Sequence, residues 1–410
     1  MHDCRTSRPV TASLTWIDLT ATDRDKVRRV LDLFKEQGTV DELGLGSLRD
    51  LFSNALFPGT SVLHTRLRYV LFIPWIYQQI ESWGGGWDVA EWSRKLEVRL
   101  IDALAESDDA AGVIGIDARE KLARMSSSAY WALLVRWGIF VPGRNQGWYH
   151  TLLDGLVRRQ ADLPRADDPG VIWEKTFTWH PHLPSAPAGF PDEASFGLAL
   201  QEADFVLGRI QERCPDSLLL WLAQEGHSEL AGVLWDEPLA MDAPEAIAET
   251  VELARRFSLH VEGAPLLYNL LLAELRNKLD EGERDEEWMA HFRAALGDWA
   301  ARESEEPSFD SDALWRFLAL SGGRLRHRQQ QFVNTWSQFL TDRGPHAVAD
   351  SRALRDLIHR REIQLKGNRA RVINQGRLLD WSGQTGVGRM EFRWPNVRRM
   401  LIDLHKGLGR

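Results

Sequence analysis

The sequence predicts a mainly α-helical protein with a small α+β module at its C-terminal end. Through most of the chain, apolar residues recur at the three- and four-residue spacing that is typical of helices. A period-two alternation, which is typical of a strand, is found near the C-terminus, where Met390, Phe392 and Trp394 alternate with charged residues. A chain of 410 residues is long enough for two or three domains, and its hydrophobic share of 44% can form a large core.

An N-terminal helical domain is predicted over residues 1–162. It starts with one short strand at 13–19, and three consecutive glycines at 84–86 interrupt its helices. Apolar periodicity and capping residues predict helices at 22–37, 47–56, 89–105 and 126–140.

The densest apolar stretch of the sequence, Phe57–Tyr77, is expected to form the centre of this domain. From Val62 onward its residues are apolar on almost all sides, which predicts a helix that is buried on most faces. Thr60 or Ser61 is the candidate cap, and Pro74 predicts a kink or a break because it lacks a backbone donor. The aliphatic and aromatic residues expected in the core are Leu71, Ile73 and Trp75.

Two arginines, Arg66 and Arg68, are set into this stretch and are expected to belong to the same structural core. An unpaired buried charge is costly, so at least one of them should form an ion pair with a carboxylate from elsewhere in residues 1–162. The alternative is that both guanidinium groups reach solvent from one helix edge. The run is shorter than the about 20 residues that span a bilayer, so no membrane contact is expected.

Residues 163–195 are predicted to form a connector, because they contain six of the 17 prolines. A strand-like segment lies within it at 171–179. A middle helical domain is expected over 196–345, and its acidic interval at 280–312 is typical of a solvated face. The periodicity predicts helices in this domain at about 195–213, 218–224, 245–257 and 266–279.

A basic C-terminal module is predicted over residues 346–410. A helix at 350–366 is followed by two short strands, 377–381 and 387–394, which a turn-rich segment joins. Pro395 then opens a final helix. The order of helix, hairpin and helix fits a winged-helix-like module, and it fits equally well a hairpin that caps the helical body.

Charge is unevenly distributed along the chain. The net charge of −9 combines a balance of +11 over residues 324–410, with 18 Lys and Arg against 7 Asp and Glu, and a balance of −20 over the preceding residues. A basic region on an acidic body indicates a polyanionic partner such as DNA or RNA. The alternative is that the basic region docks onto the acidic body of the same chain or of a partner protein.

The cysteine content and the N-terminus indicate the compartment. Two cysteines, Cys4 and Cys214, cannot form a disulfide framework, which fits a reducing cytosol. The first residues, MHDCRTSRPVTASLTW, lack the continuous apolar segment of a signal peptide. We therefore expect a soluble, cytoplasmic protein.

Arginines and aromatic residues are interleaved in the C-terminal module. Guanidinium groups bind phosphates with two hydrogen bonds, and flat rings can stack on unpaired bases. The alternative is a hairpin with its rings in the core and its arginines in water, and Trp381 in particular fits the core. The candidate nucleic-acid-binding residues are Arg369, Arg371, Trp381, Arg389, Arg393, Arg398 and Arg399.

Catalytic and metal-binding motifs are not found in the sequence. It contains no glycine-rich phosphate loop followed by Lys-Ser/Thr, no HExxH, no paired CxxC and no GxSxG. His180 and His182 lie among prolines without a third ligand nearby. The closest approach to a metal-dependent nuclease is Asp356, Glu362 and Lys366, but the spacing of four between the last two fits a helical ion pair. We predict no catalytic residue, no metal and no cofactor.

Several stretches together resemble an uncharacterised bacterial family, a domain of unknown function that would cover nearly the whole chain. One departure is Ser126-Ser127-Ser128, where a proline is expected before the serine. The resemblance implies a component of phage-defence gene clusters, encoded beside helicases and phospholipase-D-like proteins. It transfers no catalytic motif. The stretches that carry it are Asp41–Tyr77, Ser126–Phe140, Gly263–Leu275, Arg361–Asn374 and Leu378–Leu408.

The functional expectation combines these points. We expect a non-enzymatic adaptor subunit of an antiviral defence complex, with an acidic body that binds partner proteins, such as the neighbouring helicase or phospholipase-D-like protein. Its basic module would bind DNA or RNA backbone without reading sequence. The alternatives are a divergent metal-dependent nuclease and a scaffold that contacts protein alone.

Overall fold

The structure is a computed structural model that describes residues 42–83, 88–153, 178–279 and 283–410. These residues form helices and irregular segments, and none of them belongs to a β-strand. An isolated antiparallel bridge joins Phe140 to Trp179. The prediction of a mainly α-helical fold is confirmed. The strand at 13–19, the helix at 22–37, Cys4 and residues 163–177 of the predicted connector lie outside the described residues.

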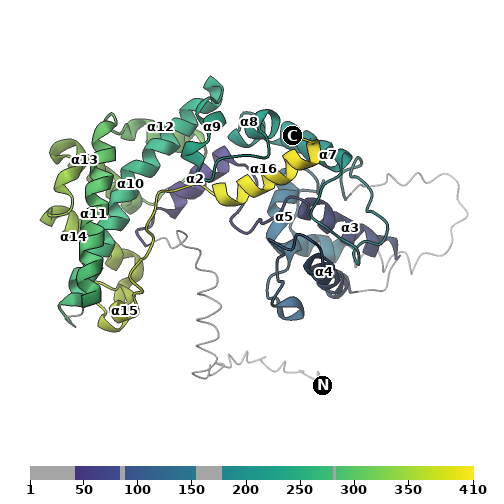
Figure 1. Ribbon diagram of the computed structural model, residues 1–410, viewed down its shortest axis with the longest axis horizontal. Helices are drawn as coiled ribbons and strands as arrows, with labels where there is room; N and C mark the ends of the chain where they lie inside the picture. The colour runs from purple at the N-terminus through teal and green to yellow at the C-terminus, as the bar shows by residue number, and fades with distance from the viewer. Residues whose placement is uncertain (1–41, 84–87, 154–177, 280–282) are drawn as a thin grey trace, which may run out of the picture.

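The helices are arranged in two lobes on either side of α2 (Figure 1). The second lobe is built around α10, which packs against α2, α9, α11, α14 and α15. The helices of the first lobe are α3 (Tyr69–Ser82), α4 (Val89–Ala105), α5 (Ser126–Arg136), α7 (Leu200–Arg213), α8 (Leu218–Glu225) and α16 (Trp394–Leu408). Those of the second lobe are α10 (Glu245–Asn277), α11 (Glu283–Glu305), α12 (Ser311–Leu320), α13 (His327–Arg343), α14 (Arg352–Lys366) and α15 (Gln375–Leu379).

Short elements complete the fold. The helix α2 runs between the lobes, and α9 follows α8 on the way to α10 (Figure 1). One hydrophobic core extends through both lobes. The bounds of these elements are α2 (Gly46–Leu56), α9 (Pro238–Met241), η1 (Arg119–Lys121), η2 (Leu234–Asp236), η3 (Pro345–Ala347) and η4 (Gly367–Arg369).

Helix α3 begins at Tyr69, seven residues later than the prediction from Val62. The preceding turns are held by Tyr130 of α5, whose hydroxyl accepts from the Thr65 and Arg66 N–H groups at 2.8 and 3.1 Å. These backbone groups therefore bond to a distant side chain instead of to a helix. Pro74 was predicted to cause a kink or a break; it lies inside α3, so the helix is not broken there.

Most of the other N-terminal helices begin and end near the predicted residues. Helix α4 covers Val89–Ala105 as predicted, with the Asp88 carboxylate accepting from the Glu91 N–H at 2.9 Å. Helix α5 ends at Arg136, before the predicted end at residue 140. Gly138 has a φ of 68°, which a right-handed helix cannot contain.

Helix α10 replaces two helices that were predicted at 245–257 and 266–279. It runs without interruption from Glu245 to Asn277, with Pro265 inside it, and 18 of its residues are buried. At Gly263 a Cβ atom would lie 2.5 Å from the Trp299 ring, so glycine lets α10 and α11 approach closely. Burial along most of its length stabilises the continuous helix despite the proline.

The predicted C-terminal hairpin is wrong, and with it the winged-helix-like and α+β module. Residues 377–379 belong to α15, and 387–393 are irregular. Phe392 and Arg393 have left-handed φ values of 49° and 72°, which end any extended ladder. Phe392 is buried because its ring packs against Phe52 and Trp235, not because it lies on one face of a strand.

The final helix α16 was predicted correctly in its start and in its buried face. It includes Pro395 in its first turn and buries the apolar set expected from the sequence. It packs against α7 and α8 of the first lobe (Figure 1), so its contacts cross the predicted domain boundary at 346. The division into domains therefore stays a prediction. The buried residues of that set are Val397, Met400, Leu401 and Leu404.

None of the described helices combines the length and the apolar composition that crossing a bilayer requires.

Candidate functional site: an arginine-lined cleft between the lobes

A cleft with a volume of about 910 Å³ opens where α2, α10 and the C-terminal irregular segment meet the start of α16. We call it the interlobe cleft. Helix α10 forms one wall from Ser258 to Pro265, and residues 386–393 form the opposite edge. The charged residues that line it are Glu42, Arg49, Asp50, Glu262, Arg389, Glu391, Arg393 and Arg399.

The edge segment is anchored at both of its ends. At the first end, the Asn269 side chain accepts from the Thr385 N–H at 2.9 Å and donates to the Thr385 carbonyl at 2.7 Å. At the other end, Phe392 is buried against Phe52 and Trp235, and the Trp235 Nε1–H donates to the Met390 carbonyl at 3.2 Å. The chain between these anchors is thus fixed in place without secondary structure.

The backbone between the anchors keeps its donors free. From Gly386 to Phe392, no backbone N–H donates to an acceptor among the described residues. Gly386 and Gly388 have φ values of 64° and 110°, which are accessible to glycine at little cost. All seven residues line the interlobe cleft.

Arg389 has no ionic partner in the described part of the chain. Its Nε–H donates to Ser258 Oγ at 2.9 Å, and Nη2–H donates to the Arg255 carbonyl at 3.1 Å. The guanidinium carbon lies 5.2 Å from the centre of the Trp235 ring. Burial lowers the pKa of Arg389 to about 10, so the group is still charged at neutral pH. A half-buried cation with unused N–H donors is suited to an anion.

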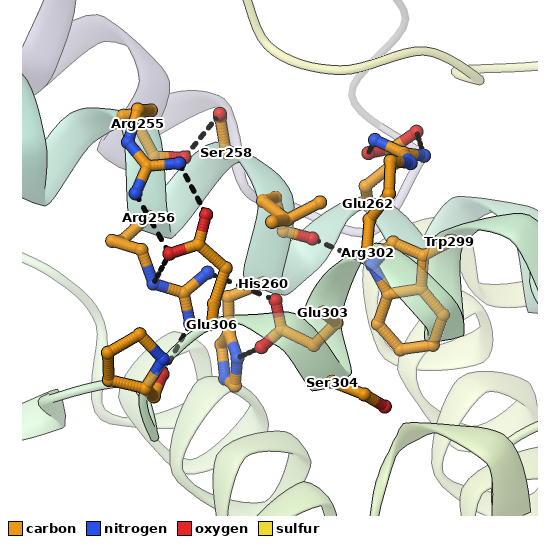
Figure 2. A network of polar contacts seen from close by, with 12 residues as sticks. Arg255, Arg256, Ser258, His260, Glu262, Trp299, Arg302, Glu303, Ser304 and Glu306 are labelled. Carbon is orange, nitrogen blue, oxygen red and sulfur yellow. Dashed lines mark hydrogen bonds and ion pairs between the residues drawn. The ribbon is translucent and has the colours of Figure 1, made fainter.

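The carboxylates nearest to Arg389 in charge interaction, Glu262 and Glu306, belong to an ion-pair network with other arginines, which Figure 2 shows. Arg255 binds Glu306 through two hydrogen bonds of 2.6 and 2.9 Å. Glu262 pairs with Arg302 at 2.9 Å. Both carboxylates are therefore paired with other arginines, and Arg389 forms an ion pair with neither of them, although Glu262 also lines the cleft.

Two other predicted arginines also line the cleft, but they differ in how many hydrogen bonds they form within the protein. Arg393 donates through Nη1 to Asn54 Oδ1 at 2.8 Å and to the Thr60 carbonyl at 2.7 Å, and it lies 3.9 Å from Asp50. Arg399 is exposed on α16. Arg393 thus ties the edge segment to the first lobe, while Arg399 is available to a ligand.

The remaining predicted binding residues lie elsewhere. Arg398 donates to the Leu230 carbonyl at 2.9 Å, and Arg371 pairs with Glu42 at 2.7 Å. Arg369 is exposed on η4, and none of the three lines the cleft. Positive charges that are close in sequence are therefore distributed over several surfaces.

Trp381 is enclosed by the second lobe and has 2% of its surface exposed. Its Nε1–H donates to Asn269 Oδ1 at 3.2 Å, and the Arg276 guanidinium carbon lies 4.8 Å from its ring centre. Trp288 and Phe292 pack nearby. The ring therefore belongs to the core and cannot stack on a base without unfolding.

The residues of the nuclease pattern are not assembled into a metal site. Asp356 is exposed, whereas Glu362 is fully buried. The Glu362 carboxylate accepts from the Tyr268 hydroxyl at 2.6 Å, from Lys366 Nζ at 3.0 Å and from the Arg371 N–H at 2.9 Å. Burial opposes the ionised form, but these donors together lower the pKa of Glu362. Its oxygens are saturated by the fold.

The first-lobe arginines are each paired with carboxylates. Arg66 donates to both Asp403 oxygens at 3.0 Å and pairs with the exposed Asp109 at 2.7 Å. Arg68 pairs with Glu202 at 2.7 Å. The expected partner within residues 1–162 is present as Asp109, but the buried partners come from α16 and α7. The hydrophobic neighbours Leu71, Ile73 and Trp75 are all buried.

The structure contains a hydrogen-bonded group of three residues that resembles a catalytic triad, and the sequence analysis did not predict it. His260 contacts Glu303 through Nδ1 at 2.7 Å and Ser337 through Nε2 at 2.8 Å (Figure 2 shows the first pair). All three are buried, and Phe309 stacks on the imidazole with ring centres 4.4 Å apart. A substrate cannot reach this serine in the described conformation, so we assign these three residues a structural role.

No metal site is formed by the histidines that the sequence singled out. His180 Nδ1 accepts from the His182 N–H at 3.2 Å, and His182 is exposed. Within the part of the chain that the structure describes, no group of three or more His, Cys, Asp or Glu side chains could hold a metal ion. Cys214 is buried, and burial raises the pKa of its thiol to about 11.

Comparison with known proteins gives a family without an activity. Residues 11–407 match a family of unknown function, DUF6361. No curated protein and no solved structure matches the chain.

Proposed function

The chain belongs to the DUF6361 family, and because that family has no assigned activity, we propose a function from the interlobe cleft itself. The protein is a non-enzymatic accessory subunit that binds nucleic-acid backbone without reading sequence. The observation that carries this proposal is the Arg389 guanidinium, which lines the cleft without an ionic partner among the described residues.

The charges around the cleft support an anionic ligand. Three of the four carboxylates in its lining are paired with cations: Glu42 with Arg371 at 2.7 Å, Asp50 with Arg49 at 3.2 Å, and Glu262 with Arg302. The fourth, Glu391, forms no ion pair among the described residues. Arg389 and Arg399 then remain as positive groups for a phosphate. Arginines that contact phosphate position a nucleic acid but do not distinguish its bases. Binding by this cleft is therefore expected to depend on salt and little on sequence.

The cellular role follows from the resemblance stated above, not from the cleft. We place the protein in the cytoplasm, in an antiviral defence complex, where it binds a neighbouring helicase or a phospholipase-D-like protein. Co-purification of this chain with its genomic neighbours tests the role. If a tagged chain isolated from its own host brings down neither class of protein, the complex is refuted.

A scaffold that contacts protein alone is the second candidate. The observation that favours it is internal pairing of the basic C-terminal residues. Arg355 pairs with Glu274, and both Lys366 and Arg371 pair with Glu42, so part of the positive charge is compensated within the chain. A divergent nuclease is a weaker alternative because Glu362 is saturated.

A salt series separates the adaptor from the scaffold. We would measure the affinity for a single-stranded and a double-stranded oligonucleotide between low and physiological salt. Combining Arg389→Gln with Arg399→Gln should reduce the slope of log affinity against log salt by about 1.4 to 1.8, since two phosphate contacts are removed. The matched control combines Arg352→Gln with Arg360→Gln, which are exposed on α14 outside the cleft.

The control decides how a loss is interpreted. If both double variants lose affinity equally, the effect is one of net charge, and the cleft is not the binding site. If the parent protein binds neither oligonucleotide at low salt, the adaptor proposal fails and the scaffold replaces it.

A further inference from the structure

The edge of the interlobe cleft has the features of a phosphate-binding loop. Gly386-Val387-Gly388-Arg389 combines two glycines in left-handed conformations with the arginine that lacks an ionic partner. Seven successive residues in this edge have N–H groups without a described acceptor. Runs of unpaired backbone N–H groups form concave sites for anions, and an adjacent arginine adds charge.

The conformation of the loop, rather than a lack of space, explains its second glycine. A Cβ atom at Gly388 would meet nothing within 4 Å, yet its φ of 110° disfavours any other residue. The loop keeps this shape because both ends are anchored, by Asn269 at Thr385 and by the buried ring of Phe392. The donors are therefore held in place before a ligand arrives, which reduces the entropy lost on binding.

Part of the lining is apolar and would contribute nothing to the binding of a bare phosphate. Aliphatic side chains come from α10, from the edge segment and from the first turn of α16. A ligand that carries both a phosphate and a flat ring would contact the charged edge and these side chains together. The apolar residues of the lining include Val261, Pro265, Val387, Met390 and Pro395.

We propose that the interlobe cleft binds one unpaired nucleotide, with its phosphate at the Gly386–Arg389 loop and its base against the apolar wall. This inference rests on the proposed binding of nucleic acid and specifies its form. A volume of about 910 Å³ lies in the range of small-ligand pockets, roughly 300–1,000 Å³. A duplex keeps its bases stacked inside, so it cannot present a base to this wall. The ligand is either a free nucleotide or a nucleotide within a single strand.

Isothermal titration with small probes tests the loop and the wall separately. We would titrate the full-length protein with adenosine monophosphate, inorganic phosphate and adenosine. We expect adenosine monophosphate to bind more tightly than either fragment. Arg389→Gln should weaken its binding by about 10- to 100-fold, because a charge-assisted hydrogen bond is lost.

A second variant isolates the apolar wall. Val387→Asn places a polar group in the lining, and it should weaken adenosine monophosphate by about fourfold or more while leaving inorganic phosphate unchanged. Arg360→Gln, on the exposed face of α14, serves as the control and should bind like the parent. Thermal unfolding of each variant checks that the fold is intact.

Oligonucleotides distinguish the two sources of the nucleotide and the two proposals. A 20-nucleotide single strand that binds about tenfold more tightly than the matching duplex, and that adenosine monophosphate displaces, supports an unpaired nucleotide of a strand. If adenosine monophosphate binds through Arg389 but no oligonucleotide binds, a free nucleotide is the ligand; this inference then stands and the backbone-binding proposal fails.

The opposite result would overturn the inference alone. If duplex and single strand bind equally, and neither adenosine monophosphate nor phosphate competes, the contacts lie on an open surface. The protein then binds backbone, but not through a nucleotide in this cleft. If no probe binds to the parent protein, both proposals are refuted.

Discussion

Arg66 in the first lobe and Arg389 in the cleft are two arginines in apolar surroundings, and they differ in their partners. Arg66 is neutralised by Asp403 and Asp109 and also donates to the Ala111 carbonyl at 2.9 Å. Arg389 contacts a hydroxyl, a carbonyl and the face of Trp235. An apolar sequence context therefore identifies arginines that need a partner, and the fold decides whether the partner is internal or a ligand.

The largest expected effect concerns the paired arginine. Asp403→Ala removes the buried partner of Arg66, so the free energy of unfolding should fall by about 3–5 kcal/mol in chemical denaturation. Asp109→Ala removes the partner that is 59% exposed and should cost less than about 1 kcal/mol. Equal losses at the two positions would mean that Asp403 does not hold the first lobe together.

Truncating an apolar residue should cost more stability in the first lobe than in the cleft wall. Leu71→Ala in α3 should cost about 2–5 kcal/mol, because the side chain is fully buried and its removal leaves a cavity. Val387→Ala in the cleft wall should cost less than about 1 kcal/mol, since this residue is half-buried beside open space. Denaturant titration measures both. A small loss at Leu71 would indicate that α3 is an exposed interface.

Acidification should lower the stability of the fold while it leaves ligand binding in the cleft little changed. Burial lowers the pKa of His64 to about 4, and its Nδ1 accepts from the Ser61 N–H at 3.1 Å, so the neutral form is required. Burial also lowers the pKa of His405 to about 4. The unfolded chain takes up protons below its ordinary histidine pKa of about 6.5, whereas the folded chain does so only near 4.

Stability should therefore be lost as the pH falls from about 6.5 to 4, by up to roughly 3 kcal/mol for each histidine. His64→Gln should flatten this dependence if the amide keeps the hydrogen bonds to the Ser61 N–H and to the Ala129 carbonyl. No histidine lines the interlobe cleft and phosphodiester groups stay ionised in this range, so the affinity for an oligonucleotide should change little above about pH 5.5, where the fold persists. A stability that does not depend on pH in this window would contradict the assignment of neutral buried histidines.

Features that depend on neighbouring residues could be predicted from the sequence, whereas features that depend on residues far apart in the sequence could not. Helix α4 and the buried face of α16 follow from local periodicity and capping, so both were predicted. The start of α3 depends on Tyr130, and the pairing of Arg66 depends on Asp403, which lies 337 residues away. No local pattern carries such information.

The cleft shows a second limit, because one sequence pattern fits two structures. Glycines near a period-two alternation are typical of a hairpin turn, and they equally fit a loop with free N–H groups. Phe392 and Arg393 in left-handed conformations decide between them, since they prevent a strand. Arg389, Arg393 and Arg399 were named from their charge and from their positions around the predicted hairpin and the start of the last helix. That they line one cleft follows from the fold.

The smallest expected effect distinguishes the two remaining arginines of the cleft. Arg393 donates to Asn54 and to the Thr60 carbonyl, so Arg393→Gln should lower the free energy of unfolding by about 1–2 kcal/mol. Arg399 is exposed, and its replacement by Gln should change the free energy of unfolding by less than about 0.5 kcal/mol.

For ligand binding, the order of the two effects should be reversed. Nη1 of Arg393 is occupied within the protein and its Nη2 lies 3.9 Å from Asp50, whereas the exposed Arg399 can contact a phosphate and release a counterion. Arg399→Gln should therefore reduce the salt slope by about 0.7 to 0.9 with no loss of stability. A salt slope that responds to Arg393 and not to Arg399 would move the ligand from the α16 side of the cleft to the α2 side.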